Sequence, residues 1–178
     1  GLLLLGLAVS GSLLAAVSTD APLPHTAAVP GGVVVIDLGP ATETAPAVHY
    51  RKKRVMVIEN NGQWQAVVGI ALSAKPGTHQ LNIAGRDGAV DFKVQTKEYD
   101  EQRLTIKNKR KVNPNAEDMK RIRGERGRIT RALGHWQQQP TVDTRFTLPV
   151  KGRLSSPFGL RRYFNEQPRK PHSGIDIA

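Results

Sequence analysis

Hydrophobic and polar residues alternate in short stretches between residues 32 and 108, and turn residues separate the stretches. Residues 33–36 and 55–58 are short runs rich in β-branched side chains, and residues 90–94 alternate apolar with charged. Asn61-Gly62 predicts a tight turn because both residue types tolerate positive φ. Short strands at roughly ten-residue spacing are typical of a small sandwich or barrel. We therefore predict a β-rich N-terminal domain over residues 32–110.

A helical pattern follows the β-rich region, within a predicted helix-and-linker segment over residues 111–144. We predict the helix over residues 115–139, with Asn115 as N-cap. Its apolar residues recur at helical spacing on one face: Met119, Ile122, Ile129, Leu133 and Trp136. Six other positions are Lys or Arg, which fits a nucleic-acid-binding helix, or a solvated face or one that touches anionic envelope polymer. We favour the second interpretation.

The start of the chain is apolar between residues 2 and 16, which is shorter than the ~20 residues of a membrane span. This length is typical of a signal-peptide core. We predict a partial signal peptide or N-terminal membrane anchor over residues 1–21 and a linker over 22–31, with a buried helix or strand as the alternative. The protein is therefore expected to be exported, to the periplasm or cell envelope.

Charge and composition narrow the possible partners. The net charge is +11, and all 26 Lys and Arg residues follow residue 50. Such a basic body suits nucleic acid, an anionic membrane surface or an anionic wall polymer. Export argues against nucleic acid, and aromatic residues make up only 5% of the chain, few for base stacking. The absence of cysteine excludes disulfides, thiolate zinc sites and a cysteine nucleophile.

The candidate chemistry lies near the end of the sequence. His172 and Asp176 form a His-x-x-x-Asp pair, and both residue types are zinc ligands. On a straight strand their Cα atoms would lie ~13 Å apart, so the chain should bend at Ser173-Gly174. Ile175 and Ile177 should then point into a core. The spacing alone also fits a pair with no metal function.

The surrounding residues give the pair a context. Ser-Ser-Pro-Phe-Gly at 155–159, two arginines at 161–162, and His-Ser-Gly-Ile-Asp-Ile-Ala at 172–178 resemble the opening of the catalytic domain in lysostaphin-like M23 zinc metallopeptidases, the murein endopeptidases. The resemblance implies that residues 145–178 begin an antiparallel-β M23 domain. It also implies that His172 and Asp176 are the first two ligands of a Zn²⁺ ion.

The same resemblance places the remaining site residues downstream. In the family, a later His-x-His motif supplies the third ligand and a catalytic histidine, and no such motif occurs here. We therefore expect an N-terminal part of a longer protein, truncated within the catalytic domain, with no catalytic residue of its own and no activity. We also expect residues 146–178 to be poorly packed. The overall fold class predicted is mainly β with one helix.

The function implied is zinc-dependent cleavage of peptide cross-links in peptidoglycan during cell-wall remodelling. Arg161 and Arg162 are candidates to bind substrate carboxylates, with a solvated surface role as the alternative. The N-terminal domain could cover the groove, and Asn113 or Asn115 could approach the metal, although cap and turn roles are favoured. The competing hypotheses are a non-catalytic M23-like scaffold that activates another wall hydrolase and a basic nucleic-acid-binding module.

Overall fold

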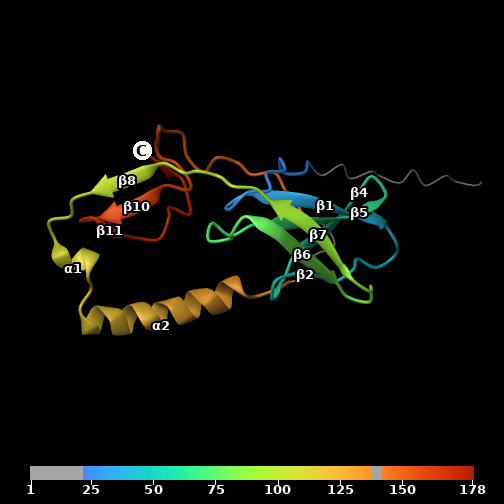
Figure 1. Ribbon diagram of the computed structural model, residues 1–178, viewed down its shortest axis with the longest axis horizontal. Helices are drawn as coiled ribbons and strands as arrows, with labels where there is room; N and C mark the ends of the chain where they lie inside the picture. Colours follow the sequence, from blue (N-terminus) through green and yellow to red (C-terminus); the bar gives the residue numbers. More distant parts are fainter. Residues whose placement is uncertain (1–21, 138–141) are drawn as a thin grey trace, which may run out of the picture.

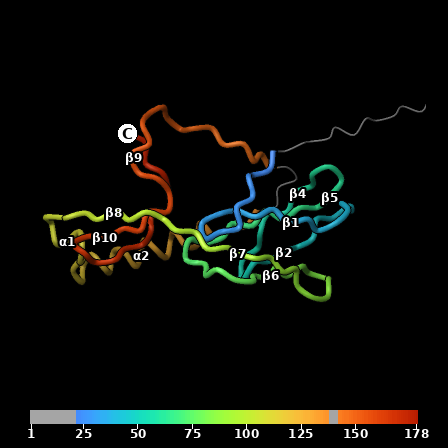
Figure 2. Tube along the Cα trace, turned by 45° about the horizontal axis from the view of Figure 1, so that its top comes forward, coloured from blue at the N-terminus to red at the C-terminus, as the bar shows by residue number. Residues whose placement is uncertain are grey.

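The computed structural model describes residues 22–137 and 142–178, and its strands gather into two lobes (Figure 1). The segment from β7 to β8 carries the chain from the first lobe to the second, as the second viewing direction also shows (Figure 2). The predicted signal peptide or anchor at residues 1–21 lies outside the described residues. Among the helices that are described, none is long and apolar enough to cross a membrane.

Two antiparallel sheets form the first lobe. One has the order β1 (Val33–Pro40), β5 (Gln63–Gly69), β4 (Met56–Asn60), and the other has the order β3 (Lys53–Arg54), β2 (Val48–Tyr50), β6 (Gly77–Ile83), β7 (Ala89–Val94). The predicted turn at Asn61-Gly62 joins β4 to β5, and both residues have positive φ, at 50° and 74°. The local turn chemistry therefore fixes the register of this hairpin.

The core of the first lobe lies between the two sheets. Its largest fully buried side chains are Val68 from the first sheet and Val48, Leu81 and Val94 from the second. Each comes from a strand in which more buried residues alternate with more exposed ones, which is the pattern of sheets that bury one face. The predicted sandwich is confirmed, and its burial of aliphatic side chains stabilises the lobe.

The second lobe is a set of short strands that draws on both halves of the sequence. β8 (Glu101–Leu104) pairs in parallel with β10 (Arg161–Phe164), and β10 also pairs with β11 (Gln167–Pro168). β9 (Leu154–Ser156) pairs in antiparallel with β12 (Asp176–Ile177). The predicted N-terminal domain over residues 32–110 includes β8, whereas the strand partner of β8 is β10 of the second lobe. A parallel partner 60 residues away leaves no local pattern by which sequence could find it.

Two helices separate β8 from β9: the short α1 (Lys109–Val112) and the long α2 (Ala116–Leu133). The predicted N-cap is confirmed, since the Asn115 side chain accepts a hydrogen bond from the Asp118 amide at 2.9 Å. The helix ends at Leu133, before the predicted residue 139, and Gly134 caps it. None of its residues is buried, and Leu133 is 82% exposed. Its apolar stripe therefore forms no core within the described residues.

Candidate metal centre

A fold-back of the chain between β9 and β12 brings the predicted ligands together. In this strand pair Asp176 lies opposite Ser156. The Gly159 amide donates to the His172 carbonyl at 2.8 Å, and the His172 amide donates to the Leu160 carbonyl at 3.0 Å. The bend expected near Gly174 is present. As a result, His172 Nε2 lies 3.2 Å from Asp176 Oδ1.

Hydrogen bonding orients the imidazole of His172. Its side chain is only 10% exposed, and Nδ1 lies 3.0 Å from the Pro157 carbonyl oxygen. Because a carbonyl only accepts, Nδ1 carries the proton and donates it there. The Ser156 hydroxyl lies 3.2 Å from the same nitrogen. With the proton on Nδ1, Nε2 is the ring nitrogen on the side of Asp176 that can offer a lone pair to a metal ion.

The spacing of the two ligand atoms fits a zinc ion. Two atoms each ~2.0–2.2 Å from a tetrahedral metal lie ~3.3–3.6 Å apart, close to the separation of Nε2 and Oδ1. Two lone pairs facing each other repel unless a metal ion or an added proton lies between them. A catalytic zinc takes three protein ligands. Residues 22–137 and 142–178 contain no group of three or more His, Cys, Asp and Glu side chains able to hold a metal, so the pair offers two candidate ligands.

Arg162 supports this site from inside the second lobe. Its guanidinium lies 3.5 Å from Asp176 Oδ2 and donates to the Ser156 hydroxyl at 3.3 Å and to Gln102 Oε1 at 3.1 Å. The β8–β10 register, which places Arg162 opposite Gln102, makes the last contact possible. The geometry of Arg162 does not favour the predicted substrate role, because Asp176, Ser156 and Gln102 already contact its guanidinium.

Arg161 occupies a different environment. Its side chain is half exposed, forms an ion pair with Glu101 at 3.2 Å and donates to the Tyr99 carbonyl at 3.1 Å. The two neighbouring arginines therefore point to separate partners, as expected for alternating residues of one strand. They do not line one groove together.

Packing around the site is uneven. Ile175 is 50% exposed and Ile177 is partly buried, so the prediction that both point into a core is wrong. The expectation of poor packing fits the segment before the site, where Phe146 is 96% exposed and Leu148 69%. It does not fit the ligand region, because Ser156, Leu160 and His172 are buried. The backbone fold-back and the short sheets give the ligands their support.

The two asparagines proposed as possible metal neighbours have other roles. Asn115 caps α2, and Asn113 ends α1 with its side-chain oxygen accepting from Arg169 at 3.3 Å. Both fill cap or turn roles, as favoured from the sequence. Sequence reasoning gave no role to Ser156 or to the Pro157 carbonyl, although both lie in the Ser-Ser-Pro-Phe-Gly motif. The only sequence feature that could have indicated a role is their place in this motif, which precedes the candidate ligand His172.

Comparison with known proteins finds similarity to the M23 peptidases and to their N-terminal domain. The profile of the peptidase family M23 N-terminal domain matches residues 26–97, which end just after β7. A crystal structure of a Pseudomonas aeruginosa protein described as a candidate peptidase M23 superposes with a TM-score of 0.63 and 35% sequence identity. The match covers 86% of this chain and 56% of that one.

The two comparisons are consistent with the M23 peptidase family, and residues 26–97 match the N-terminal domain of that family. The chain spans just over half the length of the Pseudomonas relative. No curated protein matches the sequence. The predicted fold class is confirmed: mainly antiparallel β-sheets with one long helix, here accompanied by the single turn of α1.

Proposed function

We propose that the protein is a zinc-dependent endopeptidase that cleaves peptide cross-links of peptidoglycan in the periplasm or cell envelope. The observation that carries the proposal is the His172–Asp176 pair, whose ligand atoms lie 3.2 Å apart while the Pro157 carbonyl holds the opposite ring nitrogen. Similarity to the M23 family supports peptide-bond hydrolysis as the reaction class.

The residues of this chain would hold and orient the metal. His172 would contribute Nε2 and Asp176 Oδ1, and we expect a third ligand and the catalytic histidine from the rest of the full-length protein. A bound zinc ion would polarise the scissile carbonyl and lower the pKa of a bound water to about 7. The Pro157 carbonyl keeps the His172 proton on Nδ1, and Arg162 restrains the carboxylate that faces it. The Asp176 side chain is 54% exposed, which leaves the site open to solvent and substrate.

The choice of substrate and compartment is supported by charge and by the start of the sequence. Residues 2–16 have the length and composition of an export signal. The peptides of peptidoglycan carry carboxylates, and a protein of net charge +11 attracts such an anionic polymer. Of the two arginines considered for substrate, we assign this role to Arg161, because half of its side chain remains exposed.

The test uses the full-length natural protein and compares it with three variants. Zinc content is measured by mass spectrometry after dialysis, and cleavage is followed on purified cross-linked muropeptides. One zinc per chain and cleavage are expected in the natural protein, and a loss of at least about 100-fold in zinc affinity is expected in His172→Ala and Asp176→Asn. His135→Ala removes an exposed histidine elsewhere and should change neither quantity.

The outcomes separate the proposal from its main alternative. A folded full-length protein that holds no zinc and cleaves nothing would refute the endopeptidase and support the non-catalytic scaffold. Zinc binding that survives both ligand substitutions would show that the ion sits elsewhere. Loss of zinc in His135→Ala as well would point to general damage to the fold.

A further inference from the structure

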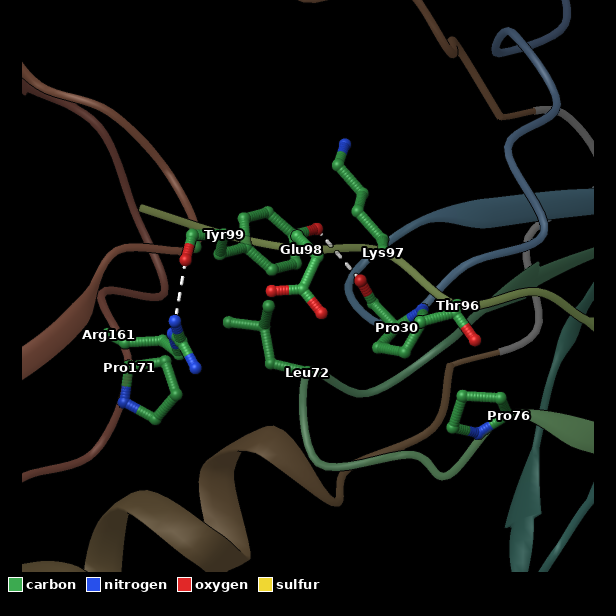
Figure 3. Close-up of a pocket in the computed structure, with 10 residues that line it drawn as sticks. Pro30, Leu72, Pro76, Thr96, Lys97, Glu98, Tyr99, Arg161 and Pro171 are labelled. Atoms are coloured by element: carbon green, nitrogen blue, oxygen red, sulfur yellow. Dashed lines mark hydrogen bonds between the residues drawn. The ribbon is translucent and has the colours of Figure 1, made fainter. Parts of the chain in front are cut away.

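Tyr99 lies at the junction between the two lobes, in the segment that leads from β7 to β8 (Figure 3). Its hydroxyl donates to the Pro30 carbonyl of the first lobe at 2.8 Å. Its own carbonyl accepts from Arg161 of the second lobe at 3.1 Å. Its ring meets that of Phe158 edge-on, with centroids 6.3 Å apart, and forms part of the wall of a pocket of about 280 Å³. One residue is thus attached to both lobes.

The ring of Tyr99 is seated directly on Gly159. A Cβ atom built on Gly159 would lie 2.1 Å from both Cδ1 and Cε1 of the ring, closer than any real Cβ contact. Only a residue without a side chain fits there. A Cβ built on Gly31, in the first lobe, would meet Leu72 and Phe158 first, at 2.6 and 2.8 Å, and the Tyr99 hydroxyl at 3.0 Å. The close contact of the Tyr99 ring is thus with Gly159 of the second lobe, while its hydroxyl lies near Gly31 and Pro30 of the first lobe.

The backbone at Gly159, against which the ring packs, also supports the candidate ligand His172. The Gly159 amide donates to the His172 carbonyl, and the His172 amide donates to the carbonyl of Leu160, the next residue. The ring thus packs against the short backbone stretch that holds His172 from both sides. This stretch ends beside Pro157, whose carbonyl orients the imidazole.

We propose that Tyr99 is a positioning residue that fixes the first metal ligand, His172, relative to the N-terminal lobe. The inference rests on the zinc site proposed above. Without the ring, Gly159 loses the packing partner that limits its movement, and the backbone bonds to His172 open more often. A ligand that is less pre-organised binds its metal more weakly. The ring carries this effect, and the hydroxyl anchors the ring to the first lobe.

The experiment uses the full-length natural protein with Tyr99→Ala, Tyr99→Phe and the control Tyr163→Ala. Tyr163, in β10 of the second lobe, is half-buried like Tyr99. Its ring packs against Arg103 instead, with the guanidinium carbon 4.2 Å from the ring centroid. Zinc affinity is measured by competition with a chromophoric chelator. Hydrogen exchange at the Gly159 and His172 amides is measured by NMR in the metal-free protein, so this readout does not depend on zinc.

The expected results follow from the packing of the Tyr99 ring on Gly159. Tyr99→Ala should lower zinc affinity about 10–100-fold and speed exchange at both amides by about tenfold or more. Tyr99→Phe keeps the ring and should stay within about threefold of the natural protein in both measurements. Tyr163→Ala should leave zinc affinity within the same range. If Tyr99→Ala does not fold, Tyr99→Leu is measured in its place with the same expectation.

Three results would overturn the proposal. One is a folded Tyr99→Ala, or Tyr99→Leu in its place, with natural zinc affinity and natural exchange at both amides. Another is an equal loss in Tyr163→Ala, which would indicate general destabilisation. The third is an equal loss in Tyr99→Phe, which would assign the effect to the hydroxyl. If the natural protein itself binds no zinc, the endopeptidase proposal fails, while exchange at Gly159 and His172 still decides whether Tyr99 supports this backbone.

Discussion

Replacing Gly159 by alanine tests how closely the two lobes are packed. Gly159 has φ of 92°, and an added methyl group would overlap two ring carbons of Tyr99 at 2.1 Å. Gly88, in the turn between β6 and β7, offers a matched control. Its φ is 80°, and a Cβ built there meets no atom within 4 Å. The two substitutions therefore share the backbone strain and differ in the steric overlap.

The expected magnitudes follow from these two terms. Holding a residue with a side chain at such a φ costs about 1–2 kcal/mol. Forcing extra volume into a packed contact adds about 1–3 kcal/mol. Gly159→Ala should thus destabilise its surroundings by about 2–5 kcal/mol, and Gly88→Ala by about 1–2 kcal/mol.

Native-state hydrogen exchange measures these free energies locally. For Gly159→Ala the informative amides are those of Arg161, which donates to the Asp100 carbonyl, and of His172, which donates to Leu160. For Gly88→Ala the amides of β7 serve the same purpose. Equal losses in the two variants would refute the reasoning, because they would mean that the Tyr99 ring moves aside at no cost and that the lobes are loosely joined.

Three further predictions concern stability. Leu81→Ala should cost about 2–5 kcal/mol in urea unfolding followed by tryptophan fluorescence, because Leu81 is fully buried, whereas Leu133→Ala on exposed α2 should stay within about 0.5 kcal/mol. Asn115→Ala removes the N-cap of α2 and should cost about 1 kcal/mol of helix stability, seen as reduced helical circular dichroism, while Asn115→Asp should preserve it. Arg110 holds the pKa of Asp118 below its ordinary value of 3.8, first by a side-chain hydrogen bond. A lowered folded-state pKa stabilises the fold above the unfolded value, so this contribution should fade in an acid titration only as the pH falls below 3.8, and Asp118→Asn should abolish that component.

Local patterns predicted the first lobe well. The turn at Asn61-Gly62 depends only on the residues within it, and both adopt the positive φ that their type allows. The alternation at residues 90–94 becomes β7, with Val94 in the core. The N-cap at Asn115 is likewise a property of four consecutive residues. In each case the interaction that selects the structure spans a few positions of the chain.

Long-range contacts escaped prediction for the same reason. β8 pairs with a strand 60 residues away, and nothing in Glu101–Leu104 indicates a parallel partner. The apolar residues of α2 recur at helical spacing, yet none of the residues of the helix is buried. At the candidate site, the motif identified His172 and Asp176, whereas the contacts of Arg162 and the seat of Tyr99 on Gly159 depend on how the two lobes meet.

The pairing of β8 with β10 also sets an order of events during synthesis. At about 5–20 residues per second, a ribosome needs roughly 3–12 s to add the 60 residues that separate Gln102 from Arg162. During this interval the first lobe can fold, while β8 has no partner strand and its backbone hydrogen-bonding groups stay unpaired. Glu101 and Arg103 place two charged side chains of opposite sign on β8, and charged side chains on an unpaired strand disfavour pairing with other chains. These charges thus reduce the risk of intermolecular strand pairing until β10 has been synthesised.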